Sequence, residues 1–245
     1  MKKYRQLTAA EMKTLEANGC IAQDWNLVTV GDGFDANRIH RVMFYGTAKL
    51  GSSAGTIEVS EGFIKNCGIN NATLRNVTIG DGCLIENIGN YINEVAIGDG
   101  CHISNVNTID TRGEATYGQG RLIAVLNEAG DGNLRLFTDL NSQFAALMVN
   151  YADNKALMAA LNDMVDRKVA DTRPACTTIG NNVTIGNTGE ITNAIIGDGC
   201  VIGGASRLSE CTIASTIANP INIGTGVICE NSIVNGGSKI TGSVK

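Results

Sequence analysis

The stretch Ile79-Gly-Asp-Gly-Cys83 recurs as Ile97-Gly-Asp-Gly-Cys101 and again as Ile196-Gly-Asp-Gly-Cys200. The first two copies begin 18 residues apart, and large apolar residues stand at every sixth position, at 79, 85, 91, 97, 103 and 109. A helix needs apolar residues about every 3.6 positions and a half-buried strand about every 2, so neither element explains a period of six. Three short strands per 18-residue unit, with each unit stacked on the last, do explain it. The sequence therefore predicts a β-solenoid.

The residue types within each repeat fit a turn between two such strands. The isoleucine would point inward, and Gly-Asp-Gly would form the corner, where a positive φ angle is easy for Gly and tolerable for Asp or Asn. The cysteine is a small apolar residue that suits an inward position with little space. Related versions occur at Ile179-Gly-Asn-Asn-Val183 and Ile223-Gly-Thr-Gly-Val227. We therefore expect stacked Ile and Cys side chains in the core.

This aliphatic-Gly-x-x-small-x pattern resembles the hexapeptide-repeat superfamily, whose members fold as left-handed parallel β-helices. The resemblance implies the handedness, because ordinary parallel crossovers are right-handed. Five further stretches are similar to a family of longer, uncharacterised hexapeptide-repeat proteins: Leu7–Met12, Asn18–Cys20, Asp24-Trp25, Tyr117–Gly120 and Leu126–Glu128. The expected fold class is mainly β, a left-handed parallel β-helix with a short N-terminal helix and an inserted β-hairpin plus helices.

The chain is expected to divide into four parts. Residues 1–56 would hold a helix, with Thr8 and Glu11 at capping-box spacing, and irregular first coils. Residues 57–110 and 177–245 would form regular β-helix coils. Residues 111–176 lack the period and are interpreted as an insertion, with a hairpin made by Arg121–Glu128 and Asn133–Phe137, followed by a helical segment.

Composition limits the classes of partner. A net charge of −5 without a run of Lys or Arg argues against nucleic acid and anionic membrane as partners. No signal peptide or spanning segment is recognised, so a cytoplasmic location is expected. The eight cysteines lack Cys-x-x-Cys pairs and are interpreted as buried, reduced thiols. Two histidines are too few for the three-His zinc site of the carbonic anhydrases in this superfamily, and no metal is expected.

The resemblance implies an acyltransferase, since hexapeptide enzymes typically move an acyl group from coenzyme A or a carrier protein to a sugar hydroxyl or amine. A histidine acts there as general base. His102 is the candidate catalytic residue, and its alternative interpretation is an exposed or hydrogen-bonded surface imidazole. In one sugar acyltransferase branch the histidine stands at a corner, where this chain has Asp81, Asp99 and Asp198. The insertion supplies the candidate substrate-binding residues: Arg112, Glu114, Tyr117, Arg121, Asn127 and Glu128.

Two functions therefore stay open. The first is an acyltransferase that uses coenzyme A, an acyl-CoA or an acyl carrier and acts on a sugar or sugar nucleotide. It would form a homotrimer, because superfamily active sites usually lie between adjacent subunits. The second is a non-catalytic β-helical scaffold or ligand-binding module of a larger assembly, which the low histidine count favours.

Overall fold

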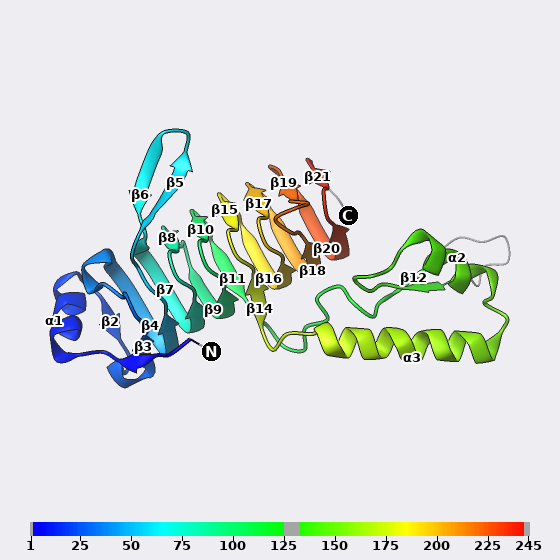
Figure 1. Ribbon diagram of the computed structural model, residues 1–245, viewed down its shortest axis with the longest axis horizontal. Coiled ribbons are helices and arrows are strands. Elements are labelled where there is room, and N and C mark those ends of the chain that lie inside the picture. Colours follow the sequence, from blue (N-terminus) through cyan, green and yellow to red (C-terminus); the bar gives the residue numbers. More distant parts are fainter. Residues whose placement is uncertain (1, 125–132, 243–245) are drawn as a thin grey trace.

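The computed structural model describes residues 2–124 and 133–242, and within them the chain is mainly β. Seventeen of the described strands form one large sheet, in which all pairs are parallel except the pair made by its first strand. Three α-helices accompany this sheet in the described residues. Figure 1 shows the strands stacked along the long axis of the molecule, from the end that carries α1 to β21.

The N-terminal residues cover one end of the sheet. Strand β1 (Arg5–Gln6) pairs antiparallel with β3 (Val28–Val30), and β2 (Ile21–Ala22) joins β4 (Ile39–Leu50) in parallel. Helix α1 (Ala9–Ala17) begins with the expected capping box, in which Thr8 accepts from the Glu11 backbone and Glu11 accepts from the Thr8 backbone. Two short 3-10 turns complete this region, η1 (Trp25–Leu27) and η2 (Ala36–Arg38).

The parallel strands pair in three series, which we call the first, second and third ladders. Strands β4 and β7 (Gly68–Ile79) are long enough to take part in all three. The first ladder continues through β8 (Leu84–Glu86), β10 (His102–Ser104), β15 (Thr184–Gly186), β17 (Val201–Gly203), β19 (Asn222–Ile223) and β21 (Lys239–Ile240). The second contains β11 (Thr108–Asp110) and the third β14 (Thr177–Ile179). Four strands cross from the second ladder to the third: β9 (Tyr91–Ile97), β16 (Glu190–Ile196), β18 (Arg207–Ala214) and β20 (Ile228–Asn235).

The register of these ladders follows the sequence period. Ile79 aligns with Ile97, and Ile97 aligns with Ile179, so the stacking resumes across the insertion. The aligned isoleucines are almost fully buried, and burial of one such side chain is worth about 1.5–3 kcal/mol. The expected inward cysteines are also buried: Cys83, Cys101 and Cys200. One position differs, because Ile92 and not Tyr91 is the buried residue, and the tyrosine lies on the outer surface.

The two glycines of each Gly-Asp-Gly corner meet different needs. A Cβ atom on Gly80 would lie 2.4 Å from the carbonyl oxygen of Gly98, so the first glycine permits the close approach of neighbouring corners. Gly82 and Gly100 have φ angles of +64° and +67°, so the second glycine supplies the left-handed conformation. The aspartate lies between the two glycines of each corner, and the Asp99 carboxylate accepts a hydrogen bond of 2.7 Å from the Asp81 backbone N–H. These contacts link the corners of successive repeats.

Two antiparallel hairpins leave the large sheet. We expected the regular coils to begin at residue 57. Residues 56–66 instead form a hairpin of β5 (Thr56–Ser60) and β6 (Phe63–Asn66) that projects from the sheet (Figure 1). In the insertion, β12 (Leu122–Ala124) pairs with β13 (Asn133–Arg135), while the expected turn between them lies outside the described residues. The two strands of the hairpin expected in the insertion are thus present and paired.

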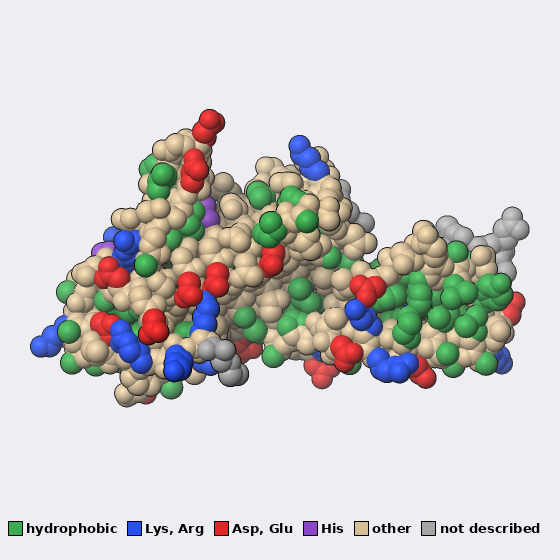
Figure 2. Space-filling view, viewed as in Figure 1, with side chains coloured by type: hydrophobic (Ala, Val, Ile, Leu, Met, Phe, Trp, Pro, Cys, Tyr) green, Lys and Arg blue, Asp and Glu red, His purple; other side chains and the backbone are tan. Residues whose placement is uncertain are grey.

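The helices of the insertion are α2 (Ser142–Asn150) and α3 (Lys155–Thr172), each capped by an asparagine. Their buried residues include Met148 and Val165, and Arg135 of β13 pairs with Asp166 of α3. Figure 1 shows the insertion extending away from the large sheet, and Figure 2 shows hydrophobic side chains gathered on its surface. Among residues 2–124 and 133–242, no helix has the length and apolar character needed to cross a membrane.

Candidate functional site

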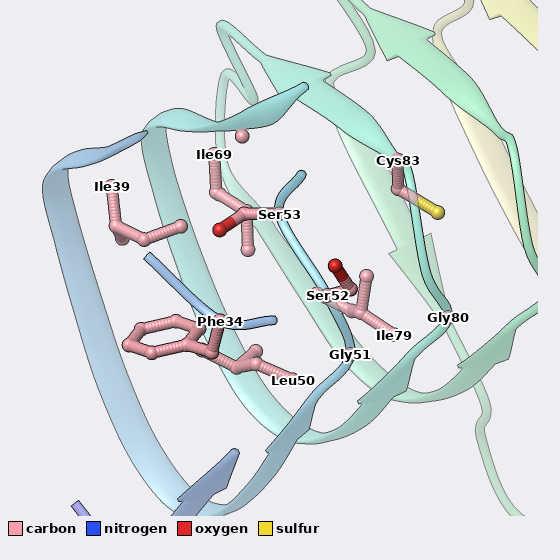
Figure 3. Close-up of a pocket in the computed structure, with 11 residues that line it drawn as sticks. Phe34, Ile39, Leu50, Gly51, Ser52, Ser53, Ile69, Ile79, Gly80 and Cys83 are labelled. Atoms are coloured by element: carbon pink, nitrogen blue, oxygen red, sulfur yellow. The ribbon is translucent and has the colours of Figure 1, made fainter. Parts of the chain in front are cut away.

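A small cavity inside the core does not qualify as a site. It measures about 20 Å³, enough for a single water molecule, and lies between Phe34, Leu50 and Cys83 (Figure 3). The hydroxyl of Ser53 accepts from the Asp35 backbone N–H and is already used. This cavity is therefore a packing gap rather than a place for a substrate.

A larger hollow lies on the outer face of the second ladder, where the insertion leaves the sheet. Its volume is about 430 Å³, within the usual range for small-molecule sites. Neighbouring strands bring its residues together, because Tyr45 aligns with Arg75, Arg75 with Asn93, and Asn93 with Asp110. Residues aligned across parallel strands point to the same side of a sheet. The complete lining is Tyr45, Thr73, Arg75, Tyr91, Asn93, Asp110, Thr111 and Arg112.

Asp110 is the anchor of this hollow, with only 3% of its surface exposed. Its carboxylate accepts hydrogen bonds from Asn93 Nδ2 and Arg112 Nε, each at 2.7 Å, and from the Tyr91 hydroxyl at 3.2 Å. The contact with Asp110 is also the main reason why the pKa of Arg112 is raised. Such charge-assisted hydrogen bonds are stronger than neutral ones. The network therefore holds Tyr91, Asn93 and Arg112 in fixed orientations.

This network determines which way the Asn93 amide points. The Asp110 carboxylate can only accept, so Asn93 must present its NH₂ group to it. Asn93 Oδ1 is then left as an acceptor, and it is buried without a hydrogen-bond partner. Buried polar atoms rarely remain unpaired, and such an atom calls for an explanation. Because Oδ1 is closed to solvent, a ligand that donates a hydrogen bond reaches this acceptor only when the side chains around it move apart.

Charges extend from the hollow along the same ladder. Arg112 also contacts Glu190 at 2.8 Å, and Arg207 of the next strand lies 3.5 Å from Glu190 and 3.1 Å from Glu230. These pairs are partly exposed, and such pairs contribute about 0–1 kcal/mol each. In contrast, Arg75 is exposed and makes no ion pair within the described part of the chain. Arg75 is therefore a cation that is available to a ligand.

The candidate base His102 lies elsewhere, in β10 of the first ladder. Its side chain is 12% exposed, and Nε2 is buried without a hydrogen-bond partner, 3.7 Å from Glu86 Oε1. Lys65 of the β5–β6 hairpin pairs with the same carboxylate. His102 thus lies on the first ladder, whereas Arg112 follows β11 of the second, and His102 is not among the residues that line the hollow beside Arg112.

The other expected binding residues have varied surroundings. Tyr117 is 1% exposed, and burial raises its pKa to about 12. Glu114 and Arg121 are exposed, whereas Asn127 and Glu128 lie outside the described residues. Of the four expected binding residues that the structure describes, Arg112 is the one that lines the hollow. Within residues 2–124 and 133–242, no group of three His, Cys, Asp or Glu side chains is arranged to hold a metal ion.

Glu210 is an important residue that sequence reasoning missed. Its carboxylate accepts hydrogen bonds from the backbone N–H groups of Thr116 and Tyr117, the Thr116 hydroxyl and the Asn193 amide. Its pKa is lowered, because these hydrogen bonds outweigh desolvation, which alone would raise it. Glu210 thereby attaches the start of the insertion to the large sheet. Nothing in the surrounding sequence, Ser209-Glu-Cys211, marks this role.

Comparison with known proteins places the chain in a family. Residues 4–245 match a family model described as a domain of unknown function (DUF4954). An uncharacterised protein of Treponema pallidum (strain Nichols) is 26% identical over 248 residues, which cover 97% of this chain and 34% of that protein. The chain thus spans about a third of the length of the relative it matches. Because the family model matches nearly the whole sequence, the chain belongs to the DUF4954 family.

Proposed function

We propose that the three ladders form a left-handed parallel β-helix of the hexapeptide-repeat type. The 18-residue register, the inward Ile and Cys side chains and the left-handed asparagines at corners support this proposal. Asn71, Asn87 and Asn105 have φ angles between 53° and 56°, a conformation that asparagine tolerates better than most residues. A rigid repeat of this kind presents a long outer surface on which a ligand can bind.

We further propose that this surface makes the chain a ligand-binding module of a larger assembly, specific for a small sugar with a negative charge, such as a sugar acid or a sugar nucleotide. Arg75 supplies a cation for the acidic group, and the Tyr45 and Tyr91 rings flank the hollow. The observation that carries the proposal is the Asn93–Asp110–Arg112 network, which fixes an unpaired acceptor for a sugar hydroxyl. The relative's greater length supports a role within a longer protein.

Calorimetric titration with galacturonate and with galactose, its uncharged counterpart, tests the binding proposal. Galacturonate should bind, and Arg75→Ala should weaken it by about tenfold or more, since a hydrogen bond to a charged group contributes about 1.5–3 kcal/mol. Arg167→Ala is the matched control, because Arg167 is an exposed arginine on α3, away from the hollow. Absence of binding at millimolar galacturonate, or equal losses in both variants, would overturn the proposal.

A second proposal is the acyltransferase implied by the hexapeptide resemblance, with a homotrimer as the active form and coenzyme A or an acyl-CoA as the donor. The specific observation in its favour is the His102 imidazole held near the Glu86 carboxylate, because a neighbouring carboxylate can orient a catalytic histidine. Since Nε2 is buried, the β5–β6 hairpin and its Lys65 contact would have to move to admit an acceptor.

Thermal-shift titration with coenzyme A and acetyl-coenzyme A tests this second proposal. A ligand that binds only the folded state raises the melting temperature in a concentration-dependent manner. Wild type and His102→Ala should both show the shift, and only wild type should transfer the acetyl group to a sugar. No shift at millimolar ligand, or a monomer in sedimentation analysis, would count against the acyltransferase.

A further inference from the structure

A second hollow adjoins the first on the same face. Its volume is about 350 Å³, and it shares Thr73 of β7 with the first hollow. On β4, Met43 lines the second hollow and Tyr45 the first, and both side chains are about two-fifths exposed. The complete lining of the second hollow is Arg41, Met43, Asn71, Ala72, Thr73, Asn87, Ile88, Gly89 and Asn90. The two hollows therefore follow one another along β4 and β7.

The second hollow offers the same kinds of group as the first. Asn71 Nδ2 donates a hydrogen bond of 3.4 Å to Asn87 Oδ1, which leaves Asn71 Oδ1 and Asn87 Nδ2 for a ligand. Both asparagines are exposed, as is Asn90. Amide groups that can both donate and accept are well matched to hydroxyl groups, which do the same. An exposed methionine adds an apolar contact suited to a sugar ring.

The charges on this face differ from those of the whole chain. The chain carries a net charge of −5, yet Arg41 and Arg75 are exposed and make no ion pair within the described residues. The nearby carboxylates of Asp110 and Glu190 are both paired with Arg112. One unpaired cation therefore lies in each hollow, and together they are complementary to a ligand with repeated negative charges.

We propose that the two hollows form one groove that binds an extended acidic oligosaccharide rather than a single sugar. From Ala72, next to the corner at Asn71, to Arg75 along β7, the groove is ~10 Å long at about 3.3 Å per residue, which is longer than one sugar ring. This inference rests on the proposed binding function and adds the length and charge pattern of the ligand. A peptide fits less well, because β7 is already paired on both sides by β4 and β9 and offers no free edge.

Titration with galacturonate oligomers of one to four units tests the inference. Affinity should increase at least about tenfold from monomer to trimer, as the second hollow becomes occupied, and change little from trimer to tetramer. Arg41→Asn should weaken the trimer about tenfold and leave the monomer unchanged, whereas Arg75→Ala should weaken both. Asparagine is chosen because Arg41 has a φ angle of 51°, which asparagine tolerates. Arg167→Ala and an unchanged melting temperature serve as controls.

The possible failures can be told apart. If the monomer binds but the trimer binds no more tightly, or if Arg41→Asn leaves the trimer unaffected, the extended groove is wrong and the proposed function stands. If neither monomer nor trimer binds, the proposed function itself fails. If uncharged galactotriose binds as well as the acidic trimer, the groove recognises sugars without regard to charge, which overturns the acidic specificity. An acidic peptide that binds more tightly than the trimer would overturn the choice of ligand class.

Discussion

Replacement of Glu210 by glutamine should weaken the attachment of the insertion to the large sheet. Glutamine keeps the length of the side chain but turns one oxygen into an NH₂ group. That group must face either the N–H donors of Thr116 and Tyr117 or the Asn193 amide, which also donates. At least one donor then loses its acceptor, which costs about 1–3 kcal/mol, and the remaining contacts lose their charge assistance. We expect a loss of about 2–3 kcal/mol in the free energy of unfolding.

The assay is urea denaturation at several pH values, with Glu230→Gln as the control. Glu230 is a carboxylate on the neighbouring strand β20, where it aligns with Ser209; it is partly exposed, and among the described residues its one ion pair is with Arg207, so its loss should cost less than about 0.5 kcal/mol. Because the pKa of Glu210 is lowered by folding, its contribution is present above its ordinary pKa and disappears as the pH falls through the folded value. The free energies of unfolding of wild type and Glu210→Gln should therefore become equal in acid. A difference below 0.5 kcal/mol at neutral pH, or one that does not shrink in acid, would refute the reasoning.

Three further predictions concern the repeat and its N-terminal cover. Gly80→Ala should lower the free energy of unfolding by more than Gly82→Ala, because the new Cβ at position 80 would clash with the next corner. The Cβ at position 82 meets open space, so that substitution costs about 1 kcal/mol for its positive φ angle alone. Equal losses of stability in denaturation would contradict this prediction. A thiol reagent should modify native protein mainly at Cys176, the one cysteine that is not buried in the described residues, and rapid reaction of several buried thiols would show that the core is open. Hydrogen bonding from Arg5 lowers the pKa of Glu11 to about 2, so the stability that Glu11 adds should disappear as the pH falls from about 4.5 to 2. Glu11→Gln should not show this loss of unfolding free energy when the pH is lowered. Identical dependence of stability on pH in wild type and Glu11→Gln would disprove the prediction.

The stacking was predictable because inward positions repeat with a fixed period. Ile79, Ile97 and Cys101 are buried where the period places them, since each must fill the same space in successive repeats. Tyr91 breaks the rule, because the segment from Ile85 of β8 to the buried isoleucine of the next strand, Ile92 of β9, is one residue longer than a hexad. A period counted from apolar residues could not reveal this step, as Tyr is apolar enough to occupy the expected position. The error matters because Tyr91 belongs to the outer hollow.

The hollow itself was largely hidden from sequence reasoning. Arg75, Asn93 and Asp110 are separated along the chain and meet only through strand register, and outward positions of the repeat carry no period of their own. Arg112 was identified because the insertion has a dense set of polar residues, but its neighbours in that set, such as buried Tyr117, serve to attach the insertion. The β5–β6 hairpin also went unnoticed, since its length fits the hexad spacing in sequence.

A crystal structure of the chain with the galacturonate trimer would show where the ligand binds. We expect the trimer on the outer face of the second ladder, along β4 and β7. Its carboxylates should lie near Arg41 and Arg75, and a hydroxyl should lie within hydrogen-bond distance of Asn93 Oδ1. A trimer bound instead beside His102, under the β5–β6 hairpin, would contradict the proposed groove and favour a site at the first ladder.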